Sequence, residues 1–155
     1  AVALLEARGF SAEDFAFYHP GGTLGRRLLL KVSDLMHTGD QLPKVKPETL
    51  MSEALLEISR KGLGMTAITD ADGRVVGIYT DGDLRRTLDQ GLDIHRTRID
   101  DVMTSHCRSV GEDILAAEAL KVMEDSRINA LLVTDGDHRL VGALNMHDLL
   151  RAGVV

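Results

Sequence analysis

The chain has 155 residues, 44% of them hydrophobic, which is enough to bury one core or two small cores packed together. A net charge of -6, an aromatic content of 3% and the lack of Trp exclude the basic surface and stacking side chains that nucleic-acid binding needs. The single cysteine cannot form an internal disulfide, and no apolar run is long enough to cross a bilayer. We therefore expect a folded cytoplasmic protein that binds neither nucleic acid nor membranes.

Residues 1 to 31 form a segment unlike the rest of the chain. It opens on AVALLEARGF, which has no initiator Met and no signal-like pattern, and which is typical of a helix already under way. A second helical piece ends at the turn HPGG, where Pro and two Gly residues stop it. We expect the chain to be part of a longer protein, with a boundary near residue 31.

The rest of the chain consists of two similar sequence repeats. The motif VSDLM at 32 to 36 recurs as IDDVM at 99 to 103. A longer stretch, MTAITDADGRVVGIYTDGDL at 65 to 84, matches NALLVTDGDHRLVGALNMHDL at 129 to 149. These matches predict an internal duplication.

Each repeat has the same order of predicted elements: helix, strand, strand and helix. Apolar residues at helical spacing follow Pro47 in the first repeat and Gly111 in the second. The period then changes to two short strand-like runs joined by an Asp/Gly turn, and a second helix follows. Because one unit is too small to bury both faces of its sheet, we predict an α/β fold in which residues 32–91 pack against residues 92–155.

One stretch of the first repeat carries candidate ligand-binding residues. In GIYTDGDL, Gly77 precedes the end of a strand, Thr80 stands at a helix start, and Asp83 follows three residues later. This spacing is typical of a capping box, in which both side chains satisfy free N–H groups of the helix. It also suits a nucleotide, because a helix start attracts phosphate, glycine lets a ligand approach the backbone, and a carboxylate accepts both ribose hydroxyls. The residues alone leave both interpretations open.

The second repeat carries a modified copy of this stretch, GALNMHD. Gly142 and Asp148 keep their positions, but Asn145 replaces the threonine. Asn caps a helix as well as Thr does, although it offers phosphate an amide in place of a hydroxyl. We therefore expect one good site, centred on Asp83, and take Asp148 as the less suited candidate. Cations near the two stretches that could reach a bound anion are Arg85, Arg86 and His147.

Other chemistry finds little support in the sequence. The six histidines and one cysteine lack the spacing of zinc ligands, so no metal site is expected. No nucleophile, base and orienting acid can be assembled, which makes an independent enzyme the weakest interpretation.

The duplicated unit resembles a pair of cystathionine-β-synthase (CBS) domains over residues 32 to 155. The family pattern is Gly, two mostly apolar residues, Thr or Ser, two variable residues, then Asp or Asn. The resemblance implies two β-α-β-β-α repeats packed side by side, with clefts for adenosine-type nucleotides or related molecules. It implies that Gly77, Thr80 and Asp83 hold phosphate and ribose. The apolar residues available to the base would be Leu42, Pro43, Val45 and Met65.

The segment before the repeats resembles the bacterial D-arabinose-5-phosphate isomerase family. The matching stretches are GFSAEDFAFYHPGGTLGRRLL, KVSDLMHTGDQLP and the terminal MHDLLRAGVV. This family joins a sugar-isomerase (SIS) domain to a CBS pair and supplies arabinose 5-phosphate for 3-deoxy-D-manno-octulosonate (Kdo), a sugar of lipopolysaccharide. The resemblance implies that residues 1–31 end the SIS domain and that His19 assists ring opening or proton transfer. The plain structural interpretation of His19 is a helix-ending turn.

The resemblance implies that the pair regulates the SIS domain of the same chain, and that these 155 residues alone are inactive. The candidate ligand is CMP-Kdo, the activated product of the pathway, which offers ribose hydroxyls and a phosphodiester. An adenine nucleotide is the family-wide alternative, and no cofactor is required. The competing interpretation is an oligomerisation module without a ligand, in which CBS pairs form a homodimer within a homo-oligomer.

Overall fold

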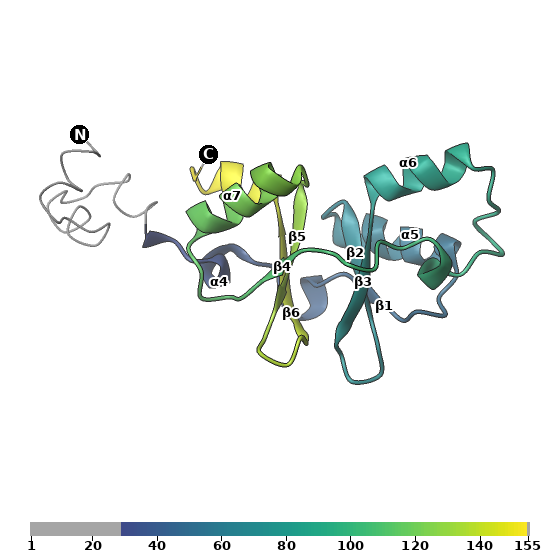
Figure 1. Ribbon diagram of the computed structural model, residues 1–155, viewed down its shortest axis with the longest axis horizontal. Helices are drawn as coiled ribbons and strands as arrows, with labels where there is room; N and C mark the ends of the chain where they lie inside the picture. Colours follow the sequence, from purple (N-terminus) through teal and green to yellow (C-terminus); the bar gives the residue numbers. More distant parts are fainter. Residues whose placement is uncertain (1–28, 155) are drawn as a thin grey trace, which may run out of the picture.

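The computed structural model describes residues 29–154 and contains two small sheets with flanking helices, one sheet in each half of the chain (Figure 1). The predicted α/β class with two packed repeats is confirmed. The predictions for His19 and for the helical pieces before residue 29 lie outside the described residues. Within residues 29–154, no helix has both the length and the apolar character that crossing a bilayer requires.

The first half contains a three-stranded sheet in the order β1-β2-β3. β1 runs parallel to β2, and β2 runs antiparallel to β3. At the turn between β2 and β3, Asp70 Oδ1 accepts from the N–H groups of Asp72 and Arg74, each at 2.9 Å, as the Asp/Gly turn pattern predicts. The elements of this half are α4 (Val32–Leu35), η1 (Gly39–Gln41), β1 (Lys44–Val45), α5 (Met51–Lys61), β2 (Met65–Thr69), β3 (Val75–Thr80) and α6 (Asp81–Asp89).

The second half repeats this pattern with the sheet order β4-β5-β6. β4 is parallel to β5, and β5 is antiparallel to β6, which is the pairing that the duplication predicts. The elements of this half are η2 (Ile99–Asp101), β4 (Ser109–Val110), α7 (Ala116–Ser126), β5 (Ala130–Thr134), β6 (Leu140–Asn145) and α8 (Met146–Arg151).

A segment near the start of each repeat crosses to the sheet of the other half. His37 N donates to Ala143 O of β6 at 2.8 Å, and Thr104 N donates to Ile78 O of β3 at 2.9 Å. These backbone bonds place each crossing segment along the outer strand of the opposite sheet. Each packed half therefore contains a segment that the sequence numbering assigns to the other repeat.

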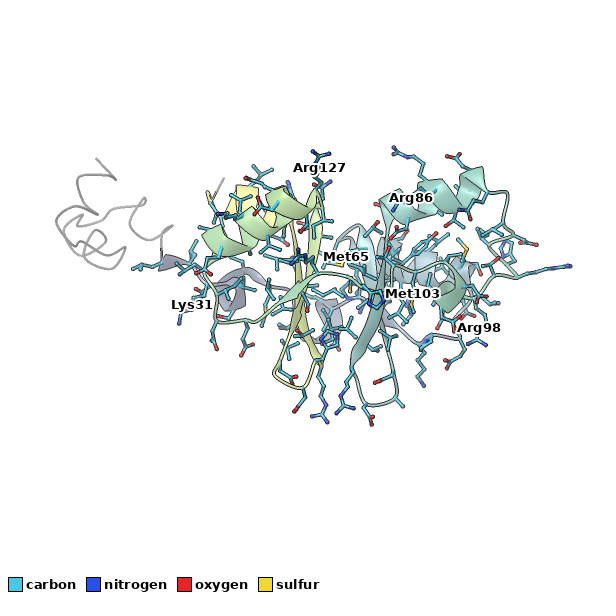
Figure 2. The ribbon with its side chains drawn as sticks, viewed as in Figure 1. Lys31, Met65, Arg86, Arg98, Met103 and Arg127 are labelled. Carbon is cyan, nitrogen blue, oxygen red and sulfur yellow. The ribbon has the colours of Figure 1, made fainter. Side chains whose placement is uncertain are left out.

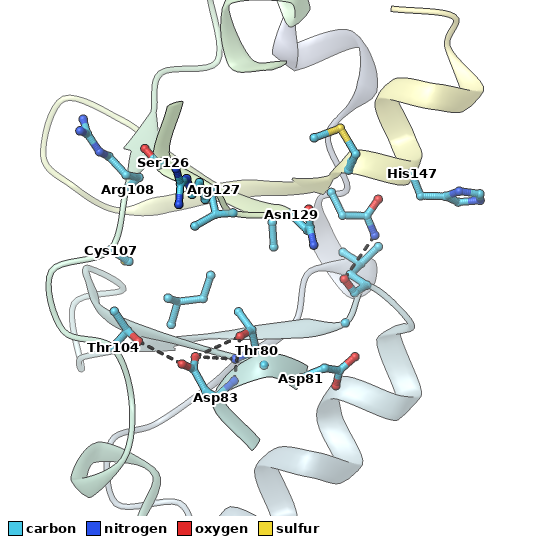
Figure 3. Close-up of a pocket in the computed structure, with 18 of the residues that line it drawn as sticks. Thr80, Asp81, Asp83, Thr104, Cys107, Arg108, Ser126, Arg127, Asn129 and His147 are labelled. Carbon is cyan, nitrogen blue, oxygen red and sulfur yellow. Dashed lines mark hydrogen bonds between the residues drawn. The ribbon is translucent and has the colours of Figure 1, made fainter. Parts of the chain in front are cut away.

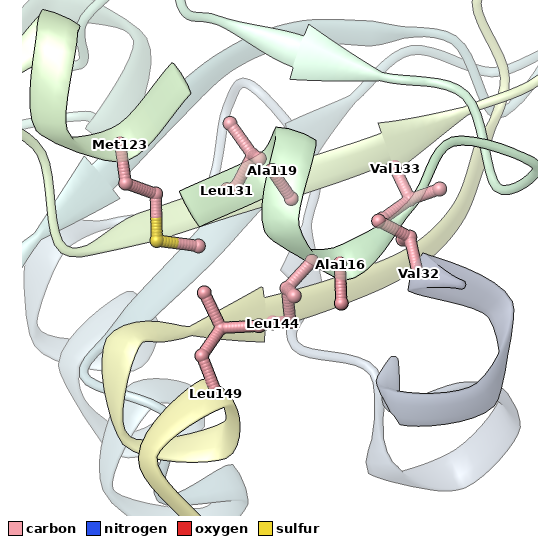
Figure 4. Close-up of a cluster of buried hydrophobic side chains, with 8 residues drawn as sticks. All are labelled: Val32, Ala116, Ala119, Met123, Leu131, Val133, Leu144 and Leu149. Carbon is pink, nitrogen blue, oxygen red and sulfur yellow. The ribbon is translucent and has the colours of Figure 1, made fainter. Parts of the chain in front are cut away.

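The crossing segments also fill the hydrophobic core. In the second half, Val32 is fully buried among side chains of α7, β5, β6 and α8 (Figure 4). In the first half, Ile99 is fully buried against Met51 and Ala54 of α5. A third cluster joins the halves and contains Leu42, Leu63, Met65, Ala67, Val75, Ile78, Leu132 and Ala143. We call this set the interface cluster, and it holds the two sheets together by burial of apolar surface.

The glycine of each repeated stretch makes room for a methionine of the crossing segment. A Cβ built on Gly77 would lie 2.5 Å from Met103 Sδ and 3.0 Å from Thr104 O. Met103 lies over the first sheet (Figure 2), and Met36 contacts Gly142 in the same way. The sequence suggested that these glycines let a ligand approach the backbone, but the protein's own methionines occupy that space.

Gly77→Ala is expected to lower the free energy of unfolding by roughly 1 to 3 kcal/mol, the usual cost of overpacking a core. The added methyl group must displace Met103 and also meets the Thr104 carbonyl oxygen, which is held in the sheet. Urea unfolding measures the change. The matched control is Gly136→Ala, where a Cβ meets nothing within 4 Å, and its effect should stay within about 0.5 kcal/mol. Equal losses in the two variants would contradict the packing explanation.

Candidate functional site

A cleft of 890 Å³ opens between the two halves. One wall comes from the junction of β3 and α6 together with the crossing segment after η2, and the other wall comes from the turn between α7 and β5 and the start of α8 (Figure 3). The polar lining includes Thr80, Asp83, Arg86, Arg108, Arg127 and Asn145. A molecule in this cleft would touch both repeats.

Asp83 forms a dense set of hydrogen bonds at the floor of the cleft. Its Oδ2 accepts from Thr80 N at 2.9 Å and from Thr80 Oγ1 at 3.1 Å, and Asp83 N donates to Thr80 Oγ1 at 3.2 Å. Its Oδ1 accepts from Thr104 Oγ1 at 3.3 Å and forms an ion pair with the Arg86 guanidinium. Only 7% of Asp83 is exposed. The predicted capping box is confirmed, and the same carboxylate also joins α6 to the crossing segment.

Asp148 occupies the equivalent position in the second half but has a different partner. Asp148 Oδ2 accepts from Asn145 N, and Asn145 Oδ1 accepts from Asp148 N, each at 2.9 Å. The other oxygen of Asp148 lies 2.9 Å from His37 Nε2. The Asn145 amide donates to Leu63 O at 3.2 Å. The capping box is therefore repeated, but an imidazole holds the carboxylate where Thr104 and Arg86 hold Asp83.

The cleft brings together Thr80, Asp83 and Asn145, three of the six ligand-binding candidates. The other three, Gly77, Gly142 and Asp148, are outside its lining. The glycines lie against methionines, as described above, and Asp148 faces His37. A smaller hollow of 470 Å³ lies beside His37 and is lined by Asp40, Gln41, Arg60 and Lys61 as well.

The residues expected near a base do not line the cleft. Leu42 and Met65 are buried in the interface cluster, where they pack with Leu132 and Ala143 of the second half, and Pro43 is buried too. Val45 packs with the core of the first half. The apolar part of the lining is instead formed by Leu63, Ile78, Ile128, Ala130, Met146 and Leu150. Spacing along the chain does not show that Leu42 and Met65 meet the opposite sheet while Val45 faces the core of its own half.

Sequence reasoning missed two cations of the cleft, Arg108 and Arg127. Neither forms a salt bridge within residues 29–154. Arg127 ends α7 with a left-handed backbone (φ 55°), a conformation that costs a residue with a side chain roughly 1 kcal/mol or more, and the first repeat has Gly62 (φ 72°) at this position. An arginine in one repeat where the other has glycine is a difference visible in the sequence, and it could have identified Arg127 as a candidate site residue. Arg86 and Arg127 lie along the same edge of the molecule, one on each half (Figure 2).

The single cysteine of the sequence, Cys107, also lines the cleft. It is partly buried, and this burial raises the pKa of its thiol above the ordinary value. No group of three or more His, Cys, Asp or Glu side chains within residues 29–154 is placed to hold a metal ion. Cys107 is therefore most useful as a chemical reporter of the cleft.

Alkylation of Cys107 by iodoacetamide should be slower at neutral pH than alkylation of the same thiol in the unfolded chain. Only the thiolate reacts, so a raised pKa lowers the reactive fraction at any given pH. The pH profile of the rate should also have its midpoint at a higher pH in the folded chain than in the unfolded chain. Mass spectrometry of timed samples gives the rate, with the chain in urea as the control. A folded-state midpoint at or below that of the unfolded chain would contradict the raised pKa.

The family model of the CBS domain matches residues 32–90 and 99–155 of the chain. The chain belongs to the CBS domain family. Both matched segments contain one of the capping boxes described above, so each CBS repeat contributes one aspartate, Asp83 or Asp148.

The chain is also similar to named isomerases. Arabinose 5-phosphate isomerase KdsD from Pseudomonas aeruginosa is 64% identical over 155 residues, which are 100% of this chain and 48% of that protein. The CBS chain spans about half the length of the curated relatives it matches.

Solved CBS structures share the fold. A crystal structure of CBSX2 in complex with AMP has a TM-score of 0.68 and 24% identity, and the match covers 81% of this chain and 96% of that one. The CBS domain pair of protein MJ0100, in complex with 5′-methylthioadenosine and S-adenosyl-L-methionine, has a TM-score of 0.72 and 23% identity, covering 79% of this chain and 94% of that one. The tandem arrangement predicted from the sequence is thereby confirmed.

Proposed function

We propose that this CBS pair is the regulatory, nucleotide-binding region of a D-arabinose-5-phosphate isomerase. The identity of 64% to a KdsD enzyme, over the whole of this chain, supports the parent activity, which converts ribulose 5-phosphate to arabinose 5-phosphate for Kdo and lipopolysaccharide synthesis. In this proposal His19 serves the SIS domain of the same chain, and the CBS repeats alone do not catalyse the reaction.

The arrangement of charged side chains in the cleft is the observation that supports a nucleotide as the ligand. A buried carboxylate, Asp83, lies in the same cleft as the guanidinium groups of Arg86, Arg108 and Arg127. A carboxylate accepts hydrogen bonds from two ribose hydroxyls, and guanidinium groups pair with phosphate oxygens. A nucleotide supplies both groups on one molecule.

Two nucleotide classes fit this arrangement. Related CBS folds have been solved with AMP and with S-adenosyl-L-methionine, which supports an adenosine ligand. CMP-Kdo carries the same ribose hydroxyls and an anionic phosphodiester, and it connects the cleft with the pathway of the parent enzyme. Either ligand would regulate the SIS domain only by binding with different affinity to two states of the full enzyme.

Calorimetric titration of the chain with CMP-Kdo, CMP, AMP and ATP should find saturable binding of at least one of them. Asp83→Asn should weaken that binding on the order of tenfold or more, because the amide loses the charge and half of the acceptor capacity offered to the ribose. Urea unfolding first verifies that the variant is folded.

The matched control is Asp148→Asn, which makes the same change in the other capping box. Because Asp83 lines the cleft and Asp148 does not, we expect one ligand per chain and unchanged affinity in this variant. Slower alkylation of Cys107 in the presence of the ligand would locate binding in the cleft. Equal loss of affinity in the two Asn variants, or no binding of the four ligands, would contradict the proposal.

The alternative function is assembly. Leu56 on α5 and Leu88 on α6 are 61% and 54% exposed, and such side chains suit a symmetric contact between two CBS pairs. Light scattering of Leu56→Lys tests this function. A lower mass together with no nucleotide binding by the unmodified chain would favour the assembly role over the sensor role.

A further inference from the structure

The carboxylate of Asp83 already has a partner at each of its acceptor positions. An ionised carboxylate offers about four lone-pair sites. Thr80 supplies two donors through its N–H and hydroxyl groups, Thr104 supplies a third, and Arg86 supplies the fourth. Each ribose hydroxyl that donates to Asp83 must therefore displace one of these partners.

The partners differ in how easily they can leave. The bond from Thr80 N belongs to the capping box, so its loss would leave the N–H group of this N-cap residue unsatisfied. Thr104 is fixed by two backbone bonds to Ile78, at 2.9 and 3.0 Å. The side chain of Arg86 is 70% exposed and projects on a flexible stem from the last turn of α6. The two threonine hydroxyls can turn their protons away but stay in place, whereas the exposed Arg86 guanidinium can move clear of the carboxylate and make room for a ligand.

We propose that Arg86 is an exchangeable partner of Asp83, which leaves the carboxylate when ribose hydroxyls bind there and then pairs with the phosphate of the same ligand. This inference rests on the nucleotide-binding function proposed above. Arg86 lines the same cleft, so its guanidinium remains within the site after the exchange.

The exchange makes Arg86 a specificity-determining residue. A neutral nucleoside must break the ion pair between Asp83 and Arg86 and offers the guanidinium no anion in return. Removing the partner of a buried charge is costly, and Asp83 is only 7% exposed. A nucleotide replaces both partners of the broken pair, because its ribose hydroxyls bind Asp83 and its phosphate binds Arg86. The site should therefore favour ligands that carry a vicinal diol and an anionic group together.

The second repeat lacks this arrangement. Its counterpart of Arg86 is Arg151, and no salt bridge joins Arg151 to Asp148 within the described part of the chain. His37, whose side chain is 25% exposed, holds Asp148 instead. The exchange of an arginine for ribose hydroxyls is thus a property of the first repeat.

Arg86→Met tests the proposal, because it keeps an unbranched apolar stem and removes the charge and the hydrogen-bond donors of the guanidinium. The probes are two pairs that differ only in the 5′-phosphate: AMP with adenosine, and CMP with cytidine. Calorimetry should show nucleotide binding weakened on the order of tenfold, through loss of a charge-assisted contact. Nucleoside binding should become tighter by roughly threefold, because Asp83 no longer has to release a cation.

Arg85→Met is the matched control. It removes the same charge from the neighbouring position of α6, and Arg85 is not part of the cleft lining. Its ratio of nucleoside to nucleotide affinity should equal that of the unmodified chain. If Arg86→Met weakens both members of a pair equally, or changes neither, the exchange is refuted while the nucleotide-binding function stands. If the unmodified chain binds none of the nucleotides, both proposals fail.

Discussion

The crossing of one short segment from each repeat onto the sheet of the other is the constraint on which the rest of the structure depends. Met103 packs on Gly77, and Thr104 exchanges backbone hydrogen bonds with Ile78. These contacts put the Thr104 hydroxyl within reach of Asp83 and lead the chain directly into the stretch that carries Arg108. The cleft is therefore a product of the crossing, and neither repeat could form it alone.

The same crossing gives the two halves different chemistry on one scaffold. The residue after the packed methionine is Thr104 in one segment and His37 in the other, and each reaches the capping aspartate of the opposite half. A hydroxyl is small and leaves room at Asp83 for a second, mobile partner. An imidazole is larger, and His37, which bonds Asp148, also lines the smaller hollow. The difference between the half-sites thus arises in the crossing segments, outside the repeated motif.

The sequence predicted the features that depend on neighbouring residues. Capping at Thr80 and Asp83, the turn at Asp70 and the duplicated element order follow from local spacing, and all are present. Contacts between distant positions were beyond this reasoning, because nothing in the spacing of GIYTDGDL shows that Met103 will cover Gly77. The packing of the residues assigned to a base pocket was beyond it for the same reason: Leu42 and Met65 meet the opposite sheet in the interface cluster, and Val45 packs with the core of the first half.

The contacts that hold α6 on the sheet determine which parts of the structure a ligand at Asp83 can move. Thr87 is 4% exposed, its hydroxyl donates to Asp83 O at 2.9 Å, and the buried Tyr79 hydroxyl donates to Thr87 Oγ1 at 2.9 Å. Together with the capping box, these bonds fix the backbone of Asp83 to the sheet, and the interface cluster resists separation of the halves. The movable group is Arg86, on the exposed rim. Occupation of the cleft should therefore alter the charge presented at this rim more than the position of α6, and a regulated domain would have to sense that charge.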